Sequence, residues 1–292
     1  MRQRTAVTAA ILLLGWAFAA AAWKPRLGSS RRPALLFPAR ICVDGGRLVV
    51  ADSVAQCLYV WNRRSRRPRV ISVAGKPLGV AVVSRPTRFL VGNATKHSVE
   101  LYSPGGRLLG RFPEPVGIPQ AIAVAPAKGL VFVADAADHS IKVFDLRSWR
   151  LKYRFGGPGG GPGEFDFPSG IAYDSAGERL VVADLMNRRL QVFDLDGNWI
   201  QTITRSGTRP MVRPQGVAVD RAGNIYVADS LWAGVYVFDP AGEPLDVLGE
   251  YGTGRGQVRT PLDVAVAAGG KVLVADFTNR RITGFAAPGG VQ

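Results

Sequence analysis

The sequence has little of the residues that usually carry metal and redox chemistry, with 2 Cys and 2 His among 292 residues. Two histidines cannot complete the three-histidine ligand set of a catalytic zinc site. Without a Cys-x-x-Cys-His motif the chain cannot attach haem covalently. The glycine-rich stretch 156–163 lacks the Lys-Ser/Thr ending of a phosphate-binding loop. We therefore predict no cofactor and no metal site.

Helical periodicity is also missing. No stretch after residue 24 repeats apolar residues at the helical spacing over ten or more positions. Short runs of Val, Ile, Tyr and Phe instead alternate with turns rich in Gly, Asp and Asn, which is typical of antiparallel strands. The pattern predicts an all-β fold, and the apolar content of 47% is sufficient for a sizeable core.

What the sequence does contain is an internal repeat. Six times a short apolar strand ends in an acidic or amide residue, and an aromatic residue follows nine positions later. A fixed repeat of about 40–50 residues with four strands in each unit indicates the blades of a β-propeller. The pairs are Asp52/Trp61, Asn93/Tyr102, Asp135/Phe144, Asp184/Phe193, Asp229/Phe238 and Asp276/Phe285.

The first residue of each pair is predicted to be structural. A carboxylate or amide at the end of a strand can accept hydrogen bonds from backbone N–H groups two or three residues further on, and so fix the turn. Asn93 can take the place of Asp in this task. A proline opens each unit, at a position where it costs no ladder hydrogen bond.

The repeat predicts six blades of four antiparallel strands, at roughly 38–75, 77–115, 119–160, 168–210, 214–256 and 261–285. The last unit has no fourth strand of its own. We expect residues 34–37 to pair as its outer strand and close the ring, which leaves no open sheet edge between the first and last blades. Cys42 and Cys57 then lie two strands apart, at roughly 10 Å, beyond the ~7 Å Cα–Cα limit of a disulfide bond. No disulfide is predicted.

The repeat resembles the NHL repeat. Pro-Ser-Gly-Ile-Ala at 168–172 leads to Val-Ala-Asp-Leu-Met-Asn-Arg-Arg-Leu-Gln-Val-Phe-Asp at 182–194. Pro-Gln-Gly-Val-Ala-Val-Asp at 214–220 likewise leads to Tyr-Val-Ala-Asp-Ser at 226–230. The resemblance covers roughly residues 38–285 and implies a six-bladed propeller. It implies no particular activity, because one fold hosts many functions.

An apolar segment precedes the repeats. Arg2 and Arg4 are followed by an apolar run at 6–23, which ends near three small residues at 20–22. We expect residues 1–23 to form an apolar helix that is either a cleaved signal peptide or a retained membrane anchor. Residues 24–32 would be a linker and 33–292 the propeller. Both alternatives predict an exported propeller, whether periplasmic, extracellular or membrane-anchored, and the run at 6–23 allows association with a membrane.

The chain is strongly basic, with 37 Lys and Arg against 22 Asp and Glu and a net charge of +15. Five arginines gather in the loop between the third and fourth strands of the first blade: Arg63, Arg64, Arg66, Arg67 and Arg69. This loop is either a basic patch for an anionic lipid surface, polymer or protein, or a solvated loop. Nucleic acid is not expected, because the leader predicts export and no aromatic residue is interleaved with the arginines for base stacking.

The predicted function is binding rather than catalysis. A repeat scaffold can vary its loops while its core stays unchanged, so we expect an exported propeller that binds a protein partner or an anionic polymer. The expected surface is the mouth where the first strands begin. Arg40 and Asp263 stand there at positions where the repeat usually has Gly. The candidate partner-binding residues are Arg40, Leu78, Gln120, Ser169, Gln215 and Asp263.

The alternative function is a hydrolase, lactonase or lyase with its site in the central channel. The six-bladed enzymes of this type hold a divalent cation on Asp, Asn and Glu of several inner strands. Here the expected inner strands are almost wholly apolar, and Asp263 is the acidic residue that we place near a channel mouth. Calcium takes about six to eight oxygen ligands, which these strands do not supply. We therefore predict no catalytic residue and assign no small-molecule substrate.

Overall fold

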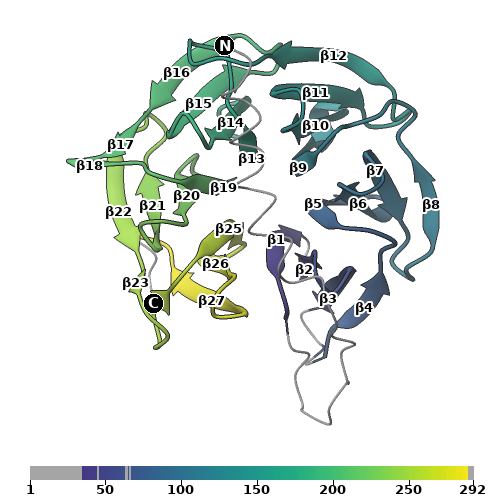
Figure 1. Cartoon of the computed structure of the whole chain (residues 1–292), viewed down its shortest axis with the longest axis horizontal. Coiled ribbons are helices and arrows are strands. Elements are labelled where there is room, and N and C mark those ends of the chain that lie inside the picture. Colours follow the sequence, from purple (N-terminus) through teal and green to yellow (C-terminus); the bar gives the residue numbers. More distant parts are fainter. Residues whose placement is uncertain (1–34, 45, 63–64, 66, 289–292) are drawn as a thin grey trace, which may run out of the picture. The chain divides into compact units, whose positions relative to one another are not determined.

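The fold is the six-bladed β-propeller predicted from the repeat. A computed structural model describes residues 35–44, 46–62, 65 and 67–288. Six antiparallel sheets surround a central axis, and the strands of each sheet follow one another from the axis outward in chain order (Figure 1). The predicted helix at 6–23 lies outside the described residues. Within the part of the chain that the structure describes, no helix is long and apolar enough to cross a membrane.

Blades 1 to 3 have four strands each. Blade 1 contains β1 (Pro38–Asp44), β2 (Arg47–Asp52), β3 (Cys57–Asn62) and β4 (Arg69–Ser72). Blade 2 contains β5 (Pro77–Ser84), β6 (Thr87–Asn93), β7 (Ser98–Tyr102) and β8 (Leu108–Arg111). Blade 3 contains β9 (Pro119–Ala125), β10 (Leu130–Asp135), β11 (Ser140–Asp145) and β12 (Leu151–Gly156), with a 3-10 turn η1 (Pro126–Lys128) between its first two strands.

Blades 4 and 5 also have four strands, and blade 6 has three. Blade 4 contains β13 (Pro168–Asp174), β14 (Arg179–Asp184), β15 (Arg189–Asp194) and β16 (Trp199–Ile203). Blade 5 contains β19 (Pro214–Val219), β20 (Ile225–Asp229), β21 (Gly234–Phe238) and β22 (Pro244–Leu248). Blade 6 contains β25 (Pro261–Ala267), β26 (Lys271–Asp276) and β27 (Arg281–Ala286). The connections into blades 5 and 6 carry the short pairs β17 (Arg205–Ser206) with β18 (Arg209–Pro210) and β23 (Glu250–Tyr251) with β24 (Gln257–Val258).

Alternation along the strands builds the core between blades. Successive side chains of a strand point to opposite faces of the sheet, so each blade packs against both of its neighbours. On β14, Leu180 and Val182 pack with Phe132 of blade 3. The intervening Val181 packs with Val217 of blade 5. Successive apolar residues of one strand therefore serve two interfaces, which explains why the central positions of the second strands, such as 180–183, are all apolar.

The predicted closure of the ring is wrong for the described residues 35–37. These residues are not a strand, and blade 6 has no fourth strand among the described residues. The backbone N–H groups of Leu36 and Phe37 donate to the Asp52 carboxylate at 2.7 and 3.0 Å. They are therefore committed to blade 1 and do not pair with β27.

The ring closes by side-chain packing and polar contacts instead. The rings of Phe37 and Phe277 lie 4.1 Å apart between centroids. Leu35 is buried in a cluster that contains Ala265 and Ala275 of blade 6. Within the described residues, the first blade thus contacts the last one without a strand shared between them.

Candidate functional site: the channel and the aspartate face

The six turn residues define one face of the propeller, called here the aspartate face. Each is fully buried at the end of a second strand. Asp135 is typical: its carboxylate accepts N–H groups from Gly117 and Ile118 in the segment before β9, at 2.7 and 2.8 Å, and from Ala137 in the following turn at 3.0 Å. Such contacts join each blade's turn to the segment that leads into its own first strand. The members are Asp52, Asn93, Asp135, Asp184, Asp229 and Asp276.

The two histidines belong to these turns. The residue four positions after each turn residue has a left-handed backbone, with φ between 51° and 56°. In blades 2 and 3 this residue is His97 and His139. His97 Nδ1 lies 2.6 Å from the Gly117 carbonyl oxygen, and His139 Nδ1 accepts the Phe167 N–H at 3.1 Å. Both rings therefore tie one blade to the lead-in of the next, which is a structural role.

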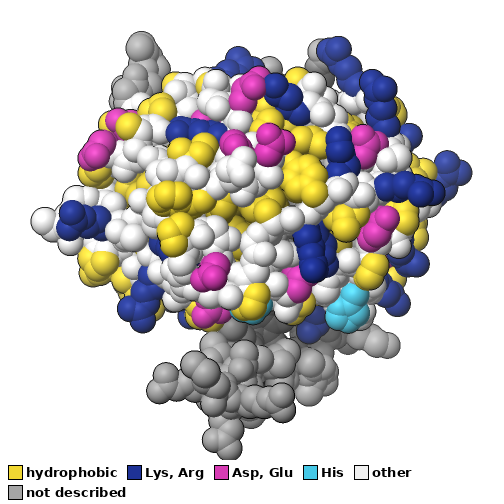
Figure 2. Space-filling view, turned by 90° about the horizontal axis from the view of Figure 1, so that it is seen from above, with side chains coloured by type: hydrophobic (Ala, Val, Ile, Leu, Met, Phe, Trp, Pro, Cys, Tyr) yellow, Lys and Arg dark blue, Asp and Glu magenta, His cyan; other side chains and the backbone are white. Residues whose placement is uncertain are grey.

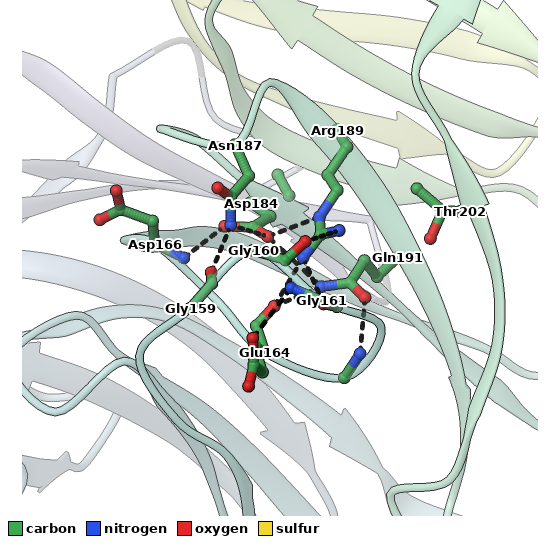
Figure 3. Close-up of polar contacts among 12 residues, drawn as sticks. Gly159, Gly160, Gly161, Glu164, Asp166, Asp184, Asn187, Arg189, Gln191 and Thr202 are labelled. Atoms are coloured by element: carbon green, nitrogen blue, oxygen red, sulfur yellow. Dashed lines mark hydrogen bonds and ion pairs between the residues drawn. The ribbon is translucent and has the colours of Figure 1, made fainter.

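In blade 4 a buried ion pair holds the glycine-rich linker (Figure 3). Arg189 Nε donates to Asp184 Oδ2 at 2.9 Å, and the two side chains are 10% and 0% exposed. The remaining guanidinium nitrogens donate to three linker carbonyls, those of Gly160, Gly161 and Glu164. Asn187 adds a contact with the Gly159 carbonyl at 2.8 Å. Arg189 and Asn187 thus act as a structural clamp that holds the linker.

Blade 6 repeats this clamp more loosely. Arg281 donates to the carbonyls of Thr253, Gly254 and Gln257 at 2.7 to 2.8 Å. Its Nε lies 3.8 Å from Asp276, and its side chain is 36% exposed. The spacing Asp-x-x-Asn-x-Arg in the sequence therefore marks a device for holding the connection between blades.

A β-bulge in every blade shapes the channel. The pairing between first and second strands shifts register directly after the opening proline in all six sheets. Bulges re-aim side chains and leave backbone groups unpaired. The third residue of each first strand sits just past this irregularity. It is Arg40 in blade 1, Asp263 in blade 6, and a small residue in the other four blades, namely Gly79, Ala121, Gly170 and Gly216.

Arg40 closes the channel. Its buried guanidinium donates to carbonyl oxygens of residues that stand second in the first strands. The bulges leave these residues outside the pairing with the second strands. Because a guanidinium carries five N–H donors in a fixed plane, one side chain can satisfy several carbonyls around the axis. The acceptors are Ala39, Gln120 (3.0 Å from Nε), Ser169 and Leu262 (2.8 Å from Nη1).

Asp263 complements Arg40 across the seam between the last and first blades. Its Oδ2 accepts the Ile41 N–H at 2.8 Å. Burial raises the pKa of Asp263 to about 6, although the charge of Arg40 and the Ile41 hydrogen bond favour the ionised form. A small cavity of about 50 Å³ remains beside the pair. The two departures from Gly that stand out in the sequence therefore meet in space and join blade 1 to blade 6.

Among the other predicted mouth residues, Gln120, Ser169 and Gln215 contribute backbone carbonyls. Leu78 and Ser169 are buried, while Gln120 and Gln215 are half-buried. Ser169 Oγ lies within hydrogen-bonding distance of the Gln215 carbonyl at 2.9 Å. The channel end is therefore a closed polar plug, and partner binding by these residues stays a prediction. Among the described residues no group of three or more His, Cys, Asp and Glu is placed to hold a metal ion.

The predicted basic loop lies away from this plug. Arg67 and Arg69 are exposed at the connection between β3 and β4, and the predicted Arg63, Arg64 and Arg66 lie outside the described residues. The loop follows the end of β3, whereas the aspartate face lies at its beginning. The structure therefore does not bring the basic loop and the mouth residues together.

A second surface was missed from the sequence. On the aspartate face of blades 5 and 6, Leu231, Trp232 and Tyr251 are 65%, 47% and 70% exposed. Arg209 lies over the Trp232 ring at 5.9 Å and Arg259 over the Tyr251 ring at 5.8 Å. We call this the arginine–aromatic surface. Its members are Arg209, Trp232, Arg259, Tyr251 and Leu231, and the exposed Arg213, Arg255 and Arg280 stand in the same connections and turns of the chain. Connection length in the sequence does not single out this surface, because the connection into blade 4 (157–167) is about as long as those into blade 5 (204–213) and blade 6 (249–260).

The cysteines are free. Cys57 is buried and Cys42 is half-buried. Burial raises the pKa of the Cys42 thiol to about 12 and that of Cys57 to about 11. Both thiols are therefore protonated at neutral pH and poor nucleophiles.

The fold, the repeat and the plugged channel define the chain as a six-bladed β-propeller protein. Residues 115–206 match a family model described as "6-bladed beta-propeller". Protein brain tumor of Drosophila melanogaster is 28% identical over 145 residues, which is 49% of this chain and 13% of that protein. Protein lin-41 of Caenorhabditis elegans is 52% identical over 46 residues, 16% of this chain and 4% of that protein. The chain therefore spans a small part of the length of both relatives.

Solved structures agree on the fold. A hydrazine synthase chain from Kuenenia stuttgartiensis superposes with a TM-score of 0.64 at 13% identity, covering 91% of this chain and 99% of that one. A structural genomics protein from Bacteroides thetaiotaomicron VPI-5482 gives 0.68 at 14% identity, covering 90% and 71%. Virginiamycin B lyase from Staphylococcus aureus gives 0.63 at 13% identity, covering 87% and 85%. At these identities the likeness shows architecture and no activity.

Proposed function

We propose that this chain is an exported NHL-type propeller that binds an acidic protein partner on its arginine–aromatic surface. The observation that carries the proposal is the exposure of Leu231, Trp232 and Tyr251 beside arginines. Trp, Tyr and Arg are the residue types that most often dominate protein–protein binding energy. The NHL-like spacing of the repeat and the partial relatives support the family assignment.

Charge selects the kind of partner. The segments 205–213, 230–233, 251–259 and 277–280 contain no Asp or Glu, and all of them except 230–233 contain arginines. The exposed Glu250, which directly precedes Tyr251, is the acidic residue next to these segments. Figure 2 shows the propeller edge-on, with Lys and Arg side chains projecting around its outline. A surface of one sign attracts a partner of the opposite sign and raises its association rate, an effect that salt weakens. The partner is therefore expected to present acidic side chains.

The apolar side chains favour a protein over a bare polymer. A polyanion can engage the arginines but gains little from Leu231, whose side chain carries no charge or hydrogen-bonding group. Burying apolar side chains contributes roughly 25 cal/mol per Å² removed from water.

Export of the propeller is proposed from the leader, in which Arg2 and Arg4 precede the apolar run at 6–23. A basic and then apolar leader is the signature of a secretory signal.

Photo-crosslinking of the full chain in its native cell tests the proposal. A photoreactive phenylalanine at Trp232 should give a discrete crosslinked protein. The matched control is the same residue at Trp199, which is 43% exposed on the outer strand of blade 4. We expect the product at 232 to disappear when Arg209 and Arg259 are changed to Ser.

Three results would contradict the proposal. Identical crosslinks from positions 232 and 199 would show that the surface has no specific partner. Retention on heparin that depends on Arg209 and Arg259, without any crosslinked protein, would indicate a polymer instead. For export, a phosphatase fused after the last residue should be active only when residues 2–23 are present; activity without them would exclude the leader from the function.

A further inference from the structure

The end of the channel opposite to the Arg40 plug opens into a pocket of about 800 Å³. It is surrounded by the turns between first and second strands of blades 1, 5 and 6, together with Ser175 from the corresponding turn of blade 4. These turns carry small residues where they meet the pocket: Gly46, Ala222 and the Ala-Ala-Gly-Gly segment at 267–270. The hollow therefore arises because most of the rim residues are small, apart from Arg47 and Arg221. Its volume falls within the range of roughly 300–1,000 Å³ that is typical of small-molecule sites.

The walls of the pocket are apolar. They are formed by Val43, Leu48, Val219, Val266 and Leu273, each of which is half-buried. These side chains lie at the ends of strands whose other apolar residues form the core between blades. An apolar ligand body that covered them would remove exposed hydrocarbon from water, which is the main driving force for binding in such sites.

The charged residues at the rim of the pocket are two aspartates, which have hydrogen-bond partners within the protein, and two arginines, whose side chains have none among the described residues. Asp220 is engaged by its own turn: it accepts Ala222 N–H and Asn224 N–H at 2.9 Å, the Asn224 side-chain amide, and the Tyr226 hydroxyl at 3.0 Å. Asp44 accepts the Ser84 hydroxyl.

The two arginines of the rim, Arg47 and Arg221, behave differently. Neither makes a side-chain hydrogen bond or ion pair with the residues that the structure describes. A guanidinium presents a planar set of donors that fits a carboxylate, sulfonate or phosphate. Each rim acid thus has a partner within the protein, while the rim arginines keep their donors free.

We propose that this pocket binds a small molecule that joins one anionic group to an apolar body. The apolar part lies against Val219, Val266 and Leu273, and the anion is held by Arg47 and Arg221. The site is on the face opposite to the arginine–aromatic surface and is independent of the function proposed above. A small-molecule ligand and a protein partner could therefore occupy the propeller together.

Fluorescence titration of the full chain with 8-anilinonaphthalene-1-sulfonate, an aromatic sulfonate, tests the site. We expect saturable binding with one molecule per chain. Because a charge-assisted hydrogen bond contributes about 1.5–3 kcal/mol, Arg47→Ser and Arg221→Ser should each weaken binding roughly tenfold or more. Ala267→Phe should fill the hollow and abolish binding. The matched control is Arg147→Ser, which removes an exposed arginine from the turn between β11 and β12, outside the pocket lining.

Competition separates the two parts of the ligand. Decanoate should displace the dye, whereas decanol, which lacks the anion, and acetate, which lacks the apolar body, should not do so at equal concentration. Equal displacement by decanol, or dye binding that is unchanged in both arginine variants, would overturn the proposal. The arginine variants keep the test decisive if Ala267→Phe fails to fold, because Arg47 and Arg221 lie at the rim and not in the core.

Discussion

Replacement of Arg40 by Met is the sharpest test of how the ring is held together. Arg40 donates to carbonyl oxygens of blades 1, 3, 4 and 6. Methionine has a similar length but no donor, so these carbonyls lose their partner and Asp263 loses its neighbouring positive charge. Removing one member of a buried charged pair costs about 3–5 kcal/mol, because the other charge stays buried without compensation. For a domain of this size that loss lowers the unfolding midpoint by roughly 6–20 °C.

The pH dependence of this loss identifies Asp263 as the cause. The pKa of Asp263 is raised by burial to about 6, whereas an Asp in the unfolded chain titrates near ~3.9. Between these values the folded protein binds more protons than the unfolded chain, so this residue's contribution to stability falls as pH rises. Without Arg40 the pKa rises further. The destabilisation of the variant should therefore be smaller at about pH 5 than at about pH 8.

Urea unfolding followed by tryptophan fluorescence measures both effects. The control is Arg147→Met, an exposed arginine whose loss should change the free energy of unfolding by less than ~0.5 kcal/mol. A loss below ~1 kcal/mol for the Arg40 variant would mean that water replaces the guanidinium at little cost. An equal loss at both pH values would show that Asp263 is not left as a buried charge. Either result would refute the polar plug.

Three further predictions concern the scaffold. Arg189→Met should destabilise the protein by about 3 kcal/mol and Arg281→Met by only about 1 kcal/mol. The smaller loss is expected because Arg281 is 36% exposed and its Nε lies 3.8 Å from Asp276. Urea unfolding of both variants measures the two losses, and equal losses would argue against burial as the cause. Gly216→Ala should lower the free energy of unfolding by about 1–3 kcal/mol, since the added Cβ would lie 1.8 Å from a carboxylate oxygen of Asp263. The control Gly110→Ala has open space around the added Cβ and should leave thermal unfolding unchanged. Equal stability of the two variants would show that the channel is not tightly packed. The pKa values of the two cysteine thiols are raised to about 12 and about 11, so both should react with iodoacetamide only after unfolding. Rapid alkylation of the native protein, read by mass spectrometry, would contradict these raised pKa values.

The sequence was sufficient for the blades, because each blade repeats a local pattern. Strand, turn residue and aromatic recur at constant spacing, and each turn acid interacts mainly with segments of its own unit, as Asp135 does with Gly117 and Ile118. The same rule, applied to Asp52, would have assigned Leu36 and Phe37 to the lead-in of blade 1 rather than to the outer strand of blade 6. The error came from treating a sheet edge as if it had to be paired.

The candidate sites depended on contacts that the repeat does not encode. The sequence singled out Arg40 and Asp263 as departures from Gly, yet the contact from Ile41 to Asp263 joins residues 222 positions apart. The arginine–aromatic surface and the 800 Å³ pocket likewise combine side chains from different blades. Hydrogen bonds and apolar packing within one unit follow from neighbouring residues and can be predicted from them. Contacts between blades, such as that of Ile41 with Asp263, depend on how the sheets curve into a ring. Only the tertiary structure decided them.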